Sequence, residues 1–261
     1  MKKRNLIVGI ILLTISIILI VFGLLTGPKG PMYVGNKALS IILYSLSVIT
    51  ILIGFNLTIN QFKIISLKEM VLISIQAAIA VLLYYFAKLK LPLTPSWLDF
   101  QVSEVPALIT SFIYGPMAGI IVLVIRFIVK LPMTITVGVG EMADLVLGVA
   151  LVLITGLIYK KHRTLKGALI SSLIGIVAST ILACLLNWLV LIPAYITIAG
   201  FPIQGLVAGM SYIKGINELN FMPYYIFLGV LPFNIIRYLA VFIFTFILYK
   251  NTKRLFVRLT N

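Results

Sequence analysis

The sequence predicts an all-α integral membrane protein of about eight spanning helices. Of its 261 residues, 62% are apolar and only 10% are charged, whereas about a quarter of the residues in a soluble domain are charged. Apolar runs of about 20 residues, the length of a spanning helix, recur along the chain. Lys and Arg flank these runs, so the net charge of +15 is explained by membrane topology and not by nucleic-acid binding.

Two of the apolar runs lie in an N-terminal segment, residues 1–66, which we treat as a separate unit. They cover Asn5 to Leu25 and Leu39 to Ile59. Basic residues at positions 2–4 give the first run some likeness to a signal peptide. Its apolar part is about twenty residues long, however, and the sequence from Thr26 to Lys29 is a poor cleavage site. We therefore expect a retained spanning helix.

The second unit, residues 67–261, contains four clear spans and one interrupted apolar stretch. The clear spans are Glu69 to Lys88, Gly140 to Lys160, Gly167 to Tyr195 and Pro223 to Lys250. The stretch from Val105 to Lys130 is interrupted by Gly115 and Pro116. Because proline removes a backbone donor and clashes with the preceding turn, this stretch predicts two short helices in a tight hairpin. Proline is favoured in a first helical turn, which makes Pro232 a candidate start for the last crossing helix proper.

The distribution of basic residues predicts that both termini are cytoplasmic. With eight helices, thirteen Lys and Arg residues fall on the cytoplasmic side and six, Lys130 among them, on the outer side. Arg126 and Arg237 then lie within the membrane. This arrangement obeys the positive-inside rule, and it places most of the acidic residues on or near the outer face.

Polar residues within the apolar runs are candidate ligand-binding residues, because charges inside a bilayer are costly and mark functional sites. Asn234 and Arg237 are three residues apart and share a helix face. If the last helix proper begins at Pro232, Asp144 lies at a comparable depth in another helix. A ligand pocket and a structural Asp144–Arg237 pair both explain these residues, and we favour the pocket. Arg126 is interpreted instead as a side chain that snorkels to the interface.

The remaining motifs predict no catalytic residue, no metal and no cofactor. His162 is the only histidine and lies in a basic cytoplasmic cluster, while Cys184 is the only cysteine. No zinc triad or Cys/His nucleophile pair can be built from them. The GxGxxA pattern from Gly138 lacks the preceding strand of a dinucleotide site. We expect these glycines to break the chain and free the N-terminus of the next helix.

Small residues and long loops indicate surfaces for partners and ligands. Ser74 and Ala78 have the small-xxx-small spacing that allows close helix approach, and Ala77 lies beside them. Internal packing and docking of a partner subunit both fit this pattern. Two outer loops, Lys88 to Glu104 and Ile196 to Met222, are long enough to serve as lids or binding loops.

Several short segments follow one another in an order and at a spacing that are typical of one transporter family. They are SEVPAL from Ser103, YGPMAG from Tyr114, GVGEMADLVLGVALVL from Gly138, LNW from Leu186, PAY from Pro193, GFP from Gly200 and PFNIIR from Pro232. With these segments, the chain from about Leu67 to Leu255 resembles the riboflavin-specific substrate-binding (S) components of energy-coupling factor (ECF) transporters.

The resemblance implies a six-helix S component, residues 67–261, in a prokaryotic cell membrane. Such a component binds riboflavin near the outer face and has no ATPase of its own. A membrane coupling protein and two cytoplasmic ATPases would drive release. The family's contact with the coupling protein carries over to Ser74, Ala77 and Ala78. The two N-terminal helices lie outside the resemblance.

The resemblance also implies a ligand set, from which this chain departs in part. Family flavin ligands include an amide at the position of Asp144, and an Asn and a Lys at the positions of Asn234 and Arg237. The family further favours Asp where Gln101 and Glu104 stand and Asn where Phe127 stands. The expected substrate-binding residues are Trp97, Leu98, Phe100, Gln101, Asp144, Asn234 and Arg237.

Asp144 and Arg237, the two charged residues that differ from the family's ligand set, remain compatible with a flavin. Its pyrimidine edge presents a carbonyl, an N–H and a carbonyl in a row. Arg237 can donate to a carbonyl and ionised Asp144 can accept from the N–H, although arginine does not simply replace lysine. Trp97, Leu98 and Phe100 would cover the ring.

Other functions stay open as alternatives. An S component for pantothenate, folate or a flavin derivative would keep the fold. A membrane enzyme acting on lipid usually needs several clustered carboxylates or histidines, and only Glu141 and Asp144 lie close together in the sequence. A scaffold whose charges serve assembly and a self-contained secondary transporter are the remaining classes.

Overall fold

The computed structural model describes residues 66–260 except Leu93, Ser96 and Ile135, together with five isolated positions between residues 42 and 53. The chain divides into two compact units, Met1–Ile65 and Ser66–Asn261. The fold and the site described below belong to the second unit. The first predicted N-terminal span lies outside the described residues, and so does the second apart from those five positions.

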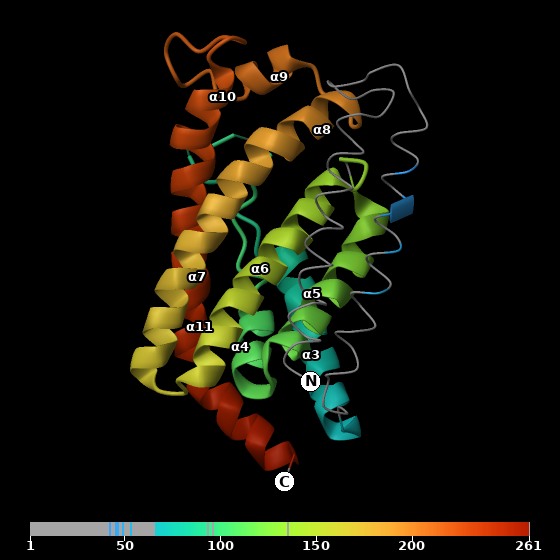
Figure 1. Cartoon of the computed structure of the whole chain (residues 1–261), viewed down its shortest axis with the longest axis vertical. Coiled ribbons are helices and arrows are strands. Elements are labelled where there is room, and N and C mark those ends of the chain that lie inside the picture. The colour runs from blue at the N-terminus through green and yellow to red at the C-terminus, as the bar shows by residue number, and fades with distance from the viewer. Residues whose placement is uncertain are drawn as a thin grey trace. The chain divides into compact units, whose positions relative to one another are not determined.

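The second unit is all-helical, as predicted, apart from one isolated β-bridge within the described residues. Five of its helical stretches are long and apolar enough to cross a membrane: Leu67–Phe86, Pro116–Met133, Val139–Lys161, Leu165–Thr197 and Phe221–Tyr249. The helices in Figure 1 are α3 (Leu67–Phe86), α4 (Val105–Tyr114), α5 (Pro116–Lys130), α6 (Val139–Lys161), α7 (Leu165–Leu186), α8 (Ile192–Thr197), α9 (Ile203–Ala208), α10 (Phe221–Tyr224) and α11 (Leu231–Thr260).

The hairpin predicted at Gly115 and Pro116 is present between α4 and α5. Gly115 adopts a φ of +101°, and α5 begins at the proline. A Cβ at Gly119 would lie 2.4 Å from the carbonyl oxygen of Ala107, so the absence of a side chain there permits the close approach of the two helices. A 3-10 turn extends the second arm to Met133, which makes it longer than the short helix predicted.

Two of the spans contain a π-helical segment just before a proline. Asn187–Leu191 precedes Pro193, and Tyr225–Val230 precedes Pro232. Proline cannot donate a hydrogen bond to the preceding turn, and π-turns are one way in which a long helix absorbs such an irregularity. Helical structure runs unbroken from Phe221, so the last helix does not begin at Pro232, and its start lies close to that of the span predicted from Pro223.

The start of α6 is built by glycine and threonine. Gly138 has a φ of +86° and directly precedes the helix, as expected for a chain break there. The carboxylate of Glu141 accepts hydrogen bonds from the hydroxyls of Thr134, at 2.6 Å, and Thr136, at 3.0 Å. The preceding turn is thereby fastened to the first turn of α6.

Loops and short helices close one end of the bundle, where α8, α9 and α10 lie together (Figure 1). The loop between α3 and α4 is pinned by the antiparallel bridge between Leu89 and Phe100. Trp97 and Leu98 of this loop pack against a buried apolar core. That core comprises Leu147, Ala183, Ile192, Leu206, Met210, Phe221, Tyr225, Ile226 and Val230. The two long loops predicted from the sequence therefore meet at one end of the molecule.

Candidate functional site

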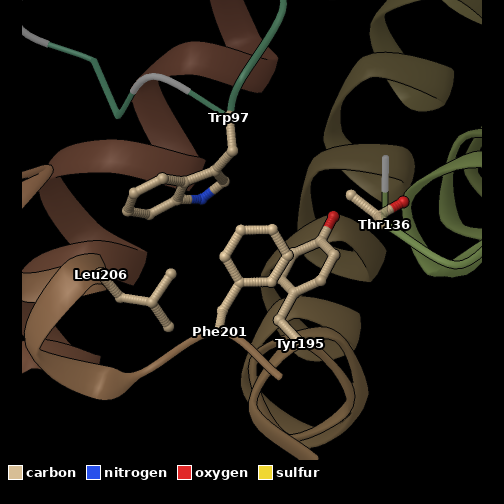
Figure 2. A pocket seen from close by; sticks show the side chains of 5 residues that line it. All are labelled: Trp97, Thr136, Tyr195, Phe201 and Leu206. Carbon is tan, nitrogen blue, oxygen red and sulfur yellow. The ribbon is translucent and has the colours of Figure 1, made fainter. Parts of the chain in front are cut away.

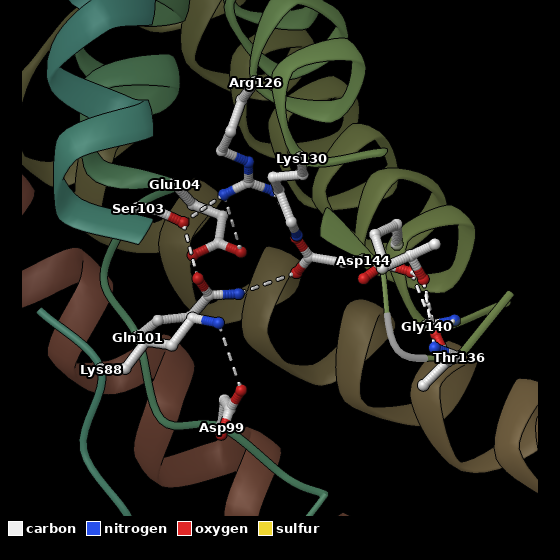
Figure 3. A network of polar contacts seen from close by, with 12 residues as sticks. Lys88, Asp99, Gln101, Ser103, Glu104, Arg126, Lys130, Thr136, Gly140 and Asp144 are labelled. Atoms are coloured by element: carbon white, nitrogen blue, oxygen red, sulfur yellow. Dashed lines mark hydrogen bonds and ion pairs between the residues drawn. The ribbon is translucent and has the colours of Figure 1, made fainter. Parts of the chain in front are cut away.

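Five charged side chains from four parts of the bundle converge in its interior. Glu104 directly precedes α4, Arg126 and Lys130 lie one turn apart on α5, Asp144 lies on α6 and Arg237 on α11. None of these side chains is more than 11% exposed. Figure 3 shows the first four turned toward one another. A charge network thus joins α4, α5, α6 and α11.

Asp144 accepts four hydrogen bonds and is the centre of this network. Its Oδ1 accepts from Gln101 Nε2 at 3.2 Å and from Arg237 Nη2 at 2.9 Å. Its Oδ2 accepts from Arg126 Nη2 at 2.8 Å and from Lys130 Nζ at 2.6 Å. A carboxylate offers about four lone-pair positions. All of the acceptor capacity of Asp144 is therefore in use.

Glu104 lies between the two arginines and is only half satisfied. Its Oε1 forms ion pairs with Arg237 Nη2 and with Arg126 Nη1, the latter at 3.5 Å. Its Oε2 has no hydrogen-bond partner among the described residues, and the same holds for the Nε atoms of both arginines. A buried polar atom without a partner costs roughly 1–3 kcal/mol. These atoms are therefore the points at which a ligand or an ordered water would gain most.

Two neutral side chains extend the network toward the loop. Arg126 Nη1 donates to the hydroxyl of Ser103, and this hydroxyl donates to Gln101 Oε1 at 3.1 Å. Gln101 in turn donates to Asp144, as described above. The residues just before α4 are thereby tied to the charges of α5 and α6.

The network carries more positive than negative charge. Three cations, Arg126, Lys130 and Arg237, face two carboxylates, so one positive charge is left in excess. The Lys130 ammonium also lies 3.8 Å from the centroid of the Tyr84 ring, which adds a cation–π contact. An excess of buried positive charge favours a ligand group that is rich in acceptors.

The structure corrects two sequence-based expectations about α5. Arg126 does not snorkel to the interface, because its side chain is 1% exposed and paired with Asp144 and Glu104. Lys130 does not lie in an outer loop but ends α5 with a side chain that is 3% exposed. Both cations turn inward because the carboxylate of Asp144 lies within hydrogen-bonding reach.

An aromatic cavity lies beside the start of α6. It has a volume of about 30 Å³ and is lined by Trp97, Thr136, Tyr195, Phe201 and Leu206 (Figure 2). The rings of Tyr195 and Phe201 meet nearly edge to face, with centroids 5.9 Å apart. Sites for vitamin-sized ligands usually measure roughly 300–1,000 Å³. Binding of such a ligand here requires the lining segments to move apart.

α6 connects this cavity to the charge network. A Cβ at Gly140 would lie 3.2 Å from the Tyr195 hydroxyl, so Tyr195 lies against the first turn of α6. Asp144 follows Gly140 by four residues and shares its helix face. The site therefore has an aromatic end and a charged end about one helical turn apart.

Trp97 is held in place by a buried polar relay. Its Nε1 donates to the Tyr225 hydroxyl at 3.1 Å, and this hydroxyl donates to Oδ1 of Asn187 at 2.7 Å. Asn187 and Tyr225 are the first residues of the two π-helical segments. A Cβ at Gly209 would lie 2.5 Å from the Trp97 ring, so the missing side chain makes room for the indole.

The other residues predicted to bind the substrate lie in the loop between α3 and α4 or deeper in the bundle. Leu98 packs on the apolar core and Phe100 pairs with Leu89, and neither lines the cavity of Figure 2. Asn234 is buried and donates to the carbonyl oxygen of Val230 at 2.8 Å. Among the three residues expected to cover the ring, only Trp97 borders the cavity.

Charged side chains also close the loop between α3 and α4. Asp99 pairs with Lys88 at 3.4 Å and also with Lys90. Partial burial would lower the pKa of Lys88, but its hydrogen bond to Tyr84 and the charge of Asp99 outweigh this and raise that pKa above its ordinary value. Lys88 stays protonated at neutral pH, so the loop keeps this contact.

The three residues expected to contact a coupling protein differ in exposure. Ser74 and Ala78 are exposed on α3, whereas Ala77 is only 1% exposed. A side chain buried within the bundle cannot touch a partner. The exposed small-residue face of α3 therefore includes Ser74 and Ala78 but not Ala77.

Sequence reasoning missed several residues of the site. They are Glu104, Arg126, Lys130, Thr136, Asn187, Tyr195, Phe201, Leu206 and Tyr225. One signal was present: two cations four residues apart on an apolar helix without an acidic residue require partners from another segment. Among the described residues, no group of three or more His, Cys, Asp and Glu side chains could hold a metal ion.

Comparison with known proteins identifies the family. The model of the substrate-specific component of ECF transporters matches residues 68–249. The chain belongs to this family. This S component is therefore a multi-pass membrane subunit for vitamin uptake and not an enzyme, as predicted.

The regions that align with this chain make up most of each relative's length. The riboflavin transporter RibU of Staphylococcus aureus (strain TCH60) is 30% identical over 184 residues, which are 70% of this chain and 89% of the relative. The riboflavin transporter FmnP of Bacillus subtilis (strain 168) is 32% identical over 174 residues, which are 65% of this chain and 84% of the relative. A solved structure described as "Structure and mechanism of the S component of a bacterial ECF transporter" is 29% identical with a TM-score of 0.56, covering 72% of this chain and 96% of that chain.

Proposed function

We propose that this S component binds riboflavin at the outer face and delivers it across the membrane together with an ATP-driven module. The observation that carries the proposal is the aromatic cavity placed one helical turn from a charge network. Riboflavin has a flat aromatic ring system with a polar edge and needs both environments. Relatives that are named riboflavin transporters support the same ligand. The vitamin is the transported substrate and not a cofactor.

In the proposed complex the ring system enters between the loop before α4 and the aromatic side chains of the cavity. Binding energy comes mainly from apolar burial, and a few placed polar groups set the orientation. The substrate-binding residues proposed from the sequence are Trp97, Leu98, Phe100, Gln101, Asp144, Asn234 and Arg237. To these we add Tyr195 and Phe201, which line the cavity.

We propose a membrane coupling protein and two cytoplasmic ATPases as partners. Ser74 and Ala78 would contact the coupling protein, because they are the exposed members of the small-residue set on α3. Residues 1–66 would add two spans to the six-helix component, giving eight spans with both termini in the cytoplasm. The excess of basic residues on the cytoplasmic side in this arrangement supports it.

Quenching of riboflavin fluorescence by the purified full-length protein tests the ligand. We expect saturable quenching with one site per chain at micromolar riboflavin or below. Trp97→Ala should weaken binding about tenfold, because the indole borders the cavity. Trp188→Ala is the matched control, since Trp188 is 46% exposed and does not line the cavity.

Absence of quenching by a folded protein would contradict riboflavin as the ligand. Competition by pantothenate or folate for bound riboflavin separates the related vitamins. Riboflavin uptake by cells that lack the coupling protein would contradict the proposed partners.

A further inference from the structure

One continuous stretch of chain, residues 192–224, closes the end of the bundle at which α8, α9 and α10 lie together (Figure 1). We call it the cap segment. It supplies three of the five side chains that line the aromatic cavity, those of Tyr195, Phe201 and Leu206. The π-helical segment Asn187–Leu191 precedes it and the π-helical segment Tyr225–Val230 follows it. Any displacement of the cap segment relative to α7 and α11 must therefore be absorbed at these two connections.

Both connections are suited to bending. A π turn has wider i→i+5 hydrogen bonds than an α-helix, and helices often bend where such turns occur. A proline lies two residues after each π segment, Pro193 in one case and Pro232 in the other, and it removes a further backbone donor. The Tyr225 hydroxyl donates to Oδ1 of Asn187 at 2.7 Å, which ties one π segment to the other. A bend in one segment is thereby coupled to a bend in the other.

The cap segment is held together by its own hydrogen bonds. The backbone N–H of Phe201 donates to the carbonyl oxygen of Tyr195 at 3.0 Å, which joins α8 to the chain that follows it. Gln204 Nε2 donates to Glu218 Oε1 at 2.8 Å, which joins α9 to the loop before α10. These bonds lie within the segment, so they stay intact when it moves as one body.

The opposite side of the cavity is fastened to the bundle. Thr136 donates to Glu141 in the first turn of α6 at 3.0 Å. Trp97 belongs to the loop that is closed by the bridge between Leu89 and Phe100, and the last residues of this loop join the charge network. Of the two sides of the cavity, it is the cap segment that has a bend at each of its ends.

We propose that the cap segment swings away from Trp97 as one body, about the two π-helical segments, when the ligand binds. The loop before α4 keeps its place. This inference rests on the proposed function, because the cavity of about 30 Å³ is far smaller than a site for a vitamin-sized ligand, roughly 300–1,000 Å³. The flat ring system then lies between Trp97 on the fixed side and Tyr195 and Phe201 on the moving side (Figure 2). The displacement is about 3.5–4 Å, the spacing that one more layer of carbon atoms requires.

Distances between paired spin labels in the full-length protein, with Cys184 replaced by Ala, test this movement. Lys214→Cys in the cap segment and Met133→Cys at the end of the turn after α5 are both exposed positions. Saturating riboflavin should change the distance between these two labels by about 3–4 Å. The pair Ile198→Cys and Lys214→Cys lies within the cap segment and should keep its distance. The pair Lys90→Cys and Met133→Cys compares the loop before α4 with the bundle and should also keep its distance.

Three outcomes of the label experiment would overturn the proposal. The first is an unchanged distance between Lys214 and Met133 with riboflavin bound. The second is a change confined to the Lys90 pair, because it would assign the movement to the loop before α4. The third is a change within the Ile198 pair, because the cap segment would then not move as one body.

Gly229→Ala tests the hinge itself. Gly229 lies in the second π segment, and a Cβ there would meet the Tyr225 ring at 3.5 Å and Pro95 at 3.7 Å, which are ordinary contact distances. Alanine resists departure from helical geometry more than glycine does, so association and dissociation of riboflavin should both slow about fivefold, with Kd changed less than about twofold. Gly205→Ala adds the same methyl group in α9 and should change neither rate. Wild-type rates in Gly229→Ala, or a changed Kd with an unchanged association rate, would contradict the hinge.

A measurement without ligand separates this proposal from the proposed function. A folded protein that does not quench riboflavin fluorescence contradicts the proposed function. In the ligand-free protein, the amide hydrogens of Asn187–Leu191 and Tyr225–Val230 should exchange about tenfold faster than those of the neighbouring α-helical turns, because the hinge opens locally. Equal protection of the π segments and these turns would overturn the proposal, whatever the ligand is.

Discussion

At the level of single residues, the buried charges are held by one saturated carboxylate. Asp144 contacts Arg126, Lys130 and Arg237 at 2.6–2.9 Å. Moving these groups out of water is costly, and the hydrogen bonds offset that cost only while the set is complete. Removal of one partner leaves an uncompensated buried charge. The network is therefore most sensitive at the residue that all three cations share.

Replacement of Asp144 by Asn should destabilise the protein by about 3–5 kcal/mol, because three buried cations lose their common carboxylate. For a protein of this size, the midpoint of thermal unfolding should fall by roughly 6–20 °C. The matched control is Asp99→Asn, whose side chain is 31% exposed in its pairs with Lys88 and Lys90. Exposed pairs contribute about 0–1 kcal/mol. Equal effects of the two substitutions would contradict the central role of Asp144.

At the level of elements, the loop before α4 and the two π-helical segments form one unit through Trp97. The indole meets Tyr225 of the second π segment, and the Tyr225 hydroxyl meets Asn187 of the first. The ring also lies against Gly209, which follows α9. Movement of this loop therefore requires the breaking of the contacts of Trp97 with the second π segment and with the residue that follows α9.

A methyl group at Gly209 should displace the indole of Trp97. The added Cβ would lie 2.5 Å from the ring, well within contact distance. Overpacking of this kind costs about 1–3 kcal/mol, so Gly209→Ala should weaken riboflavin binding about tenfold in fluorescence titrations. Gly205→Ala serves as the control, because its Cβ would meet only the Pro202 ring, at 3.5 Å. The idea fails if both variants bind like the wild type.

Loss of the Tyr225 hydroxyl should loosen the same unit. In Tyr225→Phe the buried Oδ1 of Asn187 and the Trp97 indole N–H both lose a partner. We expect a loss of about 1–3 kcal/mol in unfolding free energy, together with a red shift of the Trp97 emission as water reaches the indole. Tyr224→Phe changes a more exposed neighbour and should have little effect on either measurement. Identical behaviour of the two variants would show that the relay is dispensable.

Local features of the sequence predicted the elements better than the site. Gly115 and Pro116 determine a hairpin on their own, and apolar length determines the spans, so both were predictable. The partners of Arg126 are Asp144 and Glu104, 18 and 22 residues away along the chain on other elements. Which side chains pair between two helices depends on how each helix is oriented about its own axis. Nothing in the local sequence of α5 reveals that rotation.

At the level of the whole molecule, the predicted topology leads to a labelling experiment. With Cys184 replaced by Ala, a cysteine at Lys214 should react with a membrane-impermeant maleimide in intact cells, because the loop after α9 is expected outside. A cysteine at His162 should react only after the membrane is permeabilised. Reversed labelling would show that a span has been miscounted.

The π-helical segment Tyr225–Val230 also sets the rotational phase of α11. Each residue of an α-helix turns the chain by about 100°. Deletion of one residue within this segment would restore ordinary α-helical turns. The part of the helix before the deletion would then rotate by that angle relative to Arg237. The span would keep its hydropathy and nearly its length. With Tyr225 still facing Trp97, Arg237 would then face lipid or the wrong neighbour. The one extra residue of the π segment therefore keeps the aromatic end and the charged end of the site in register.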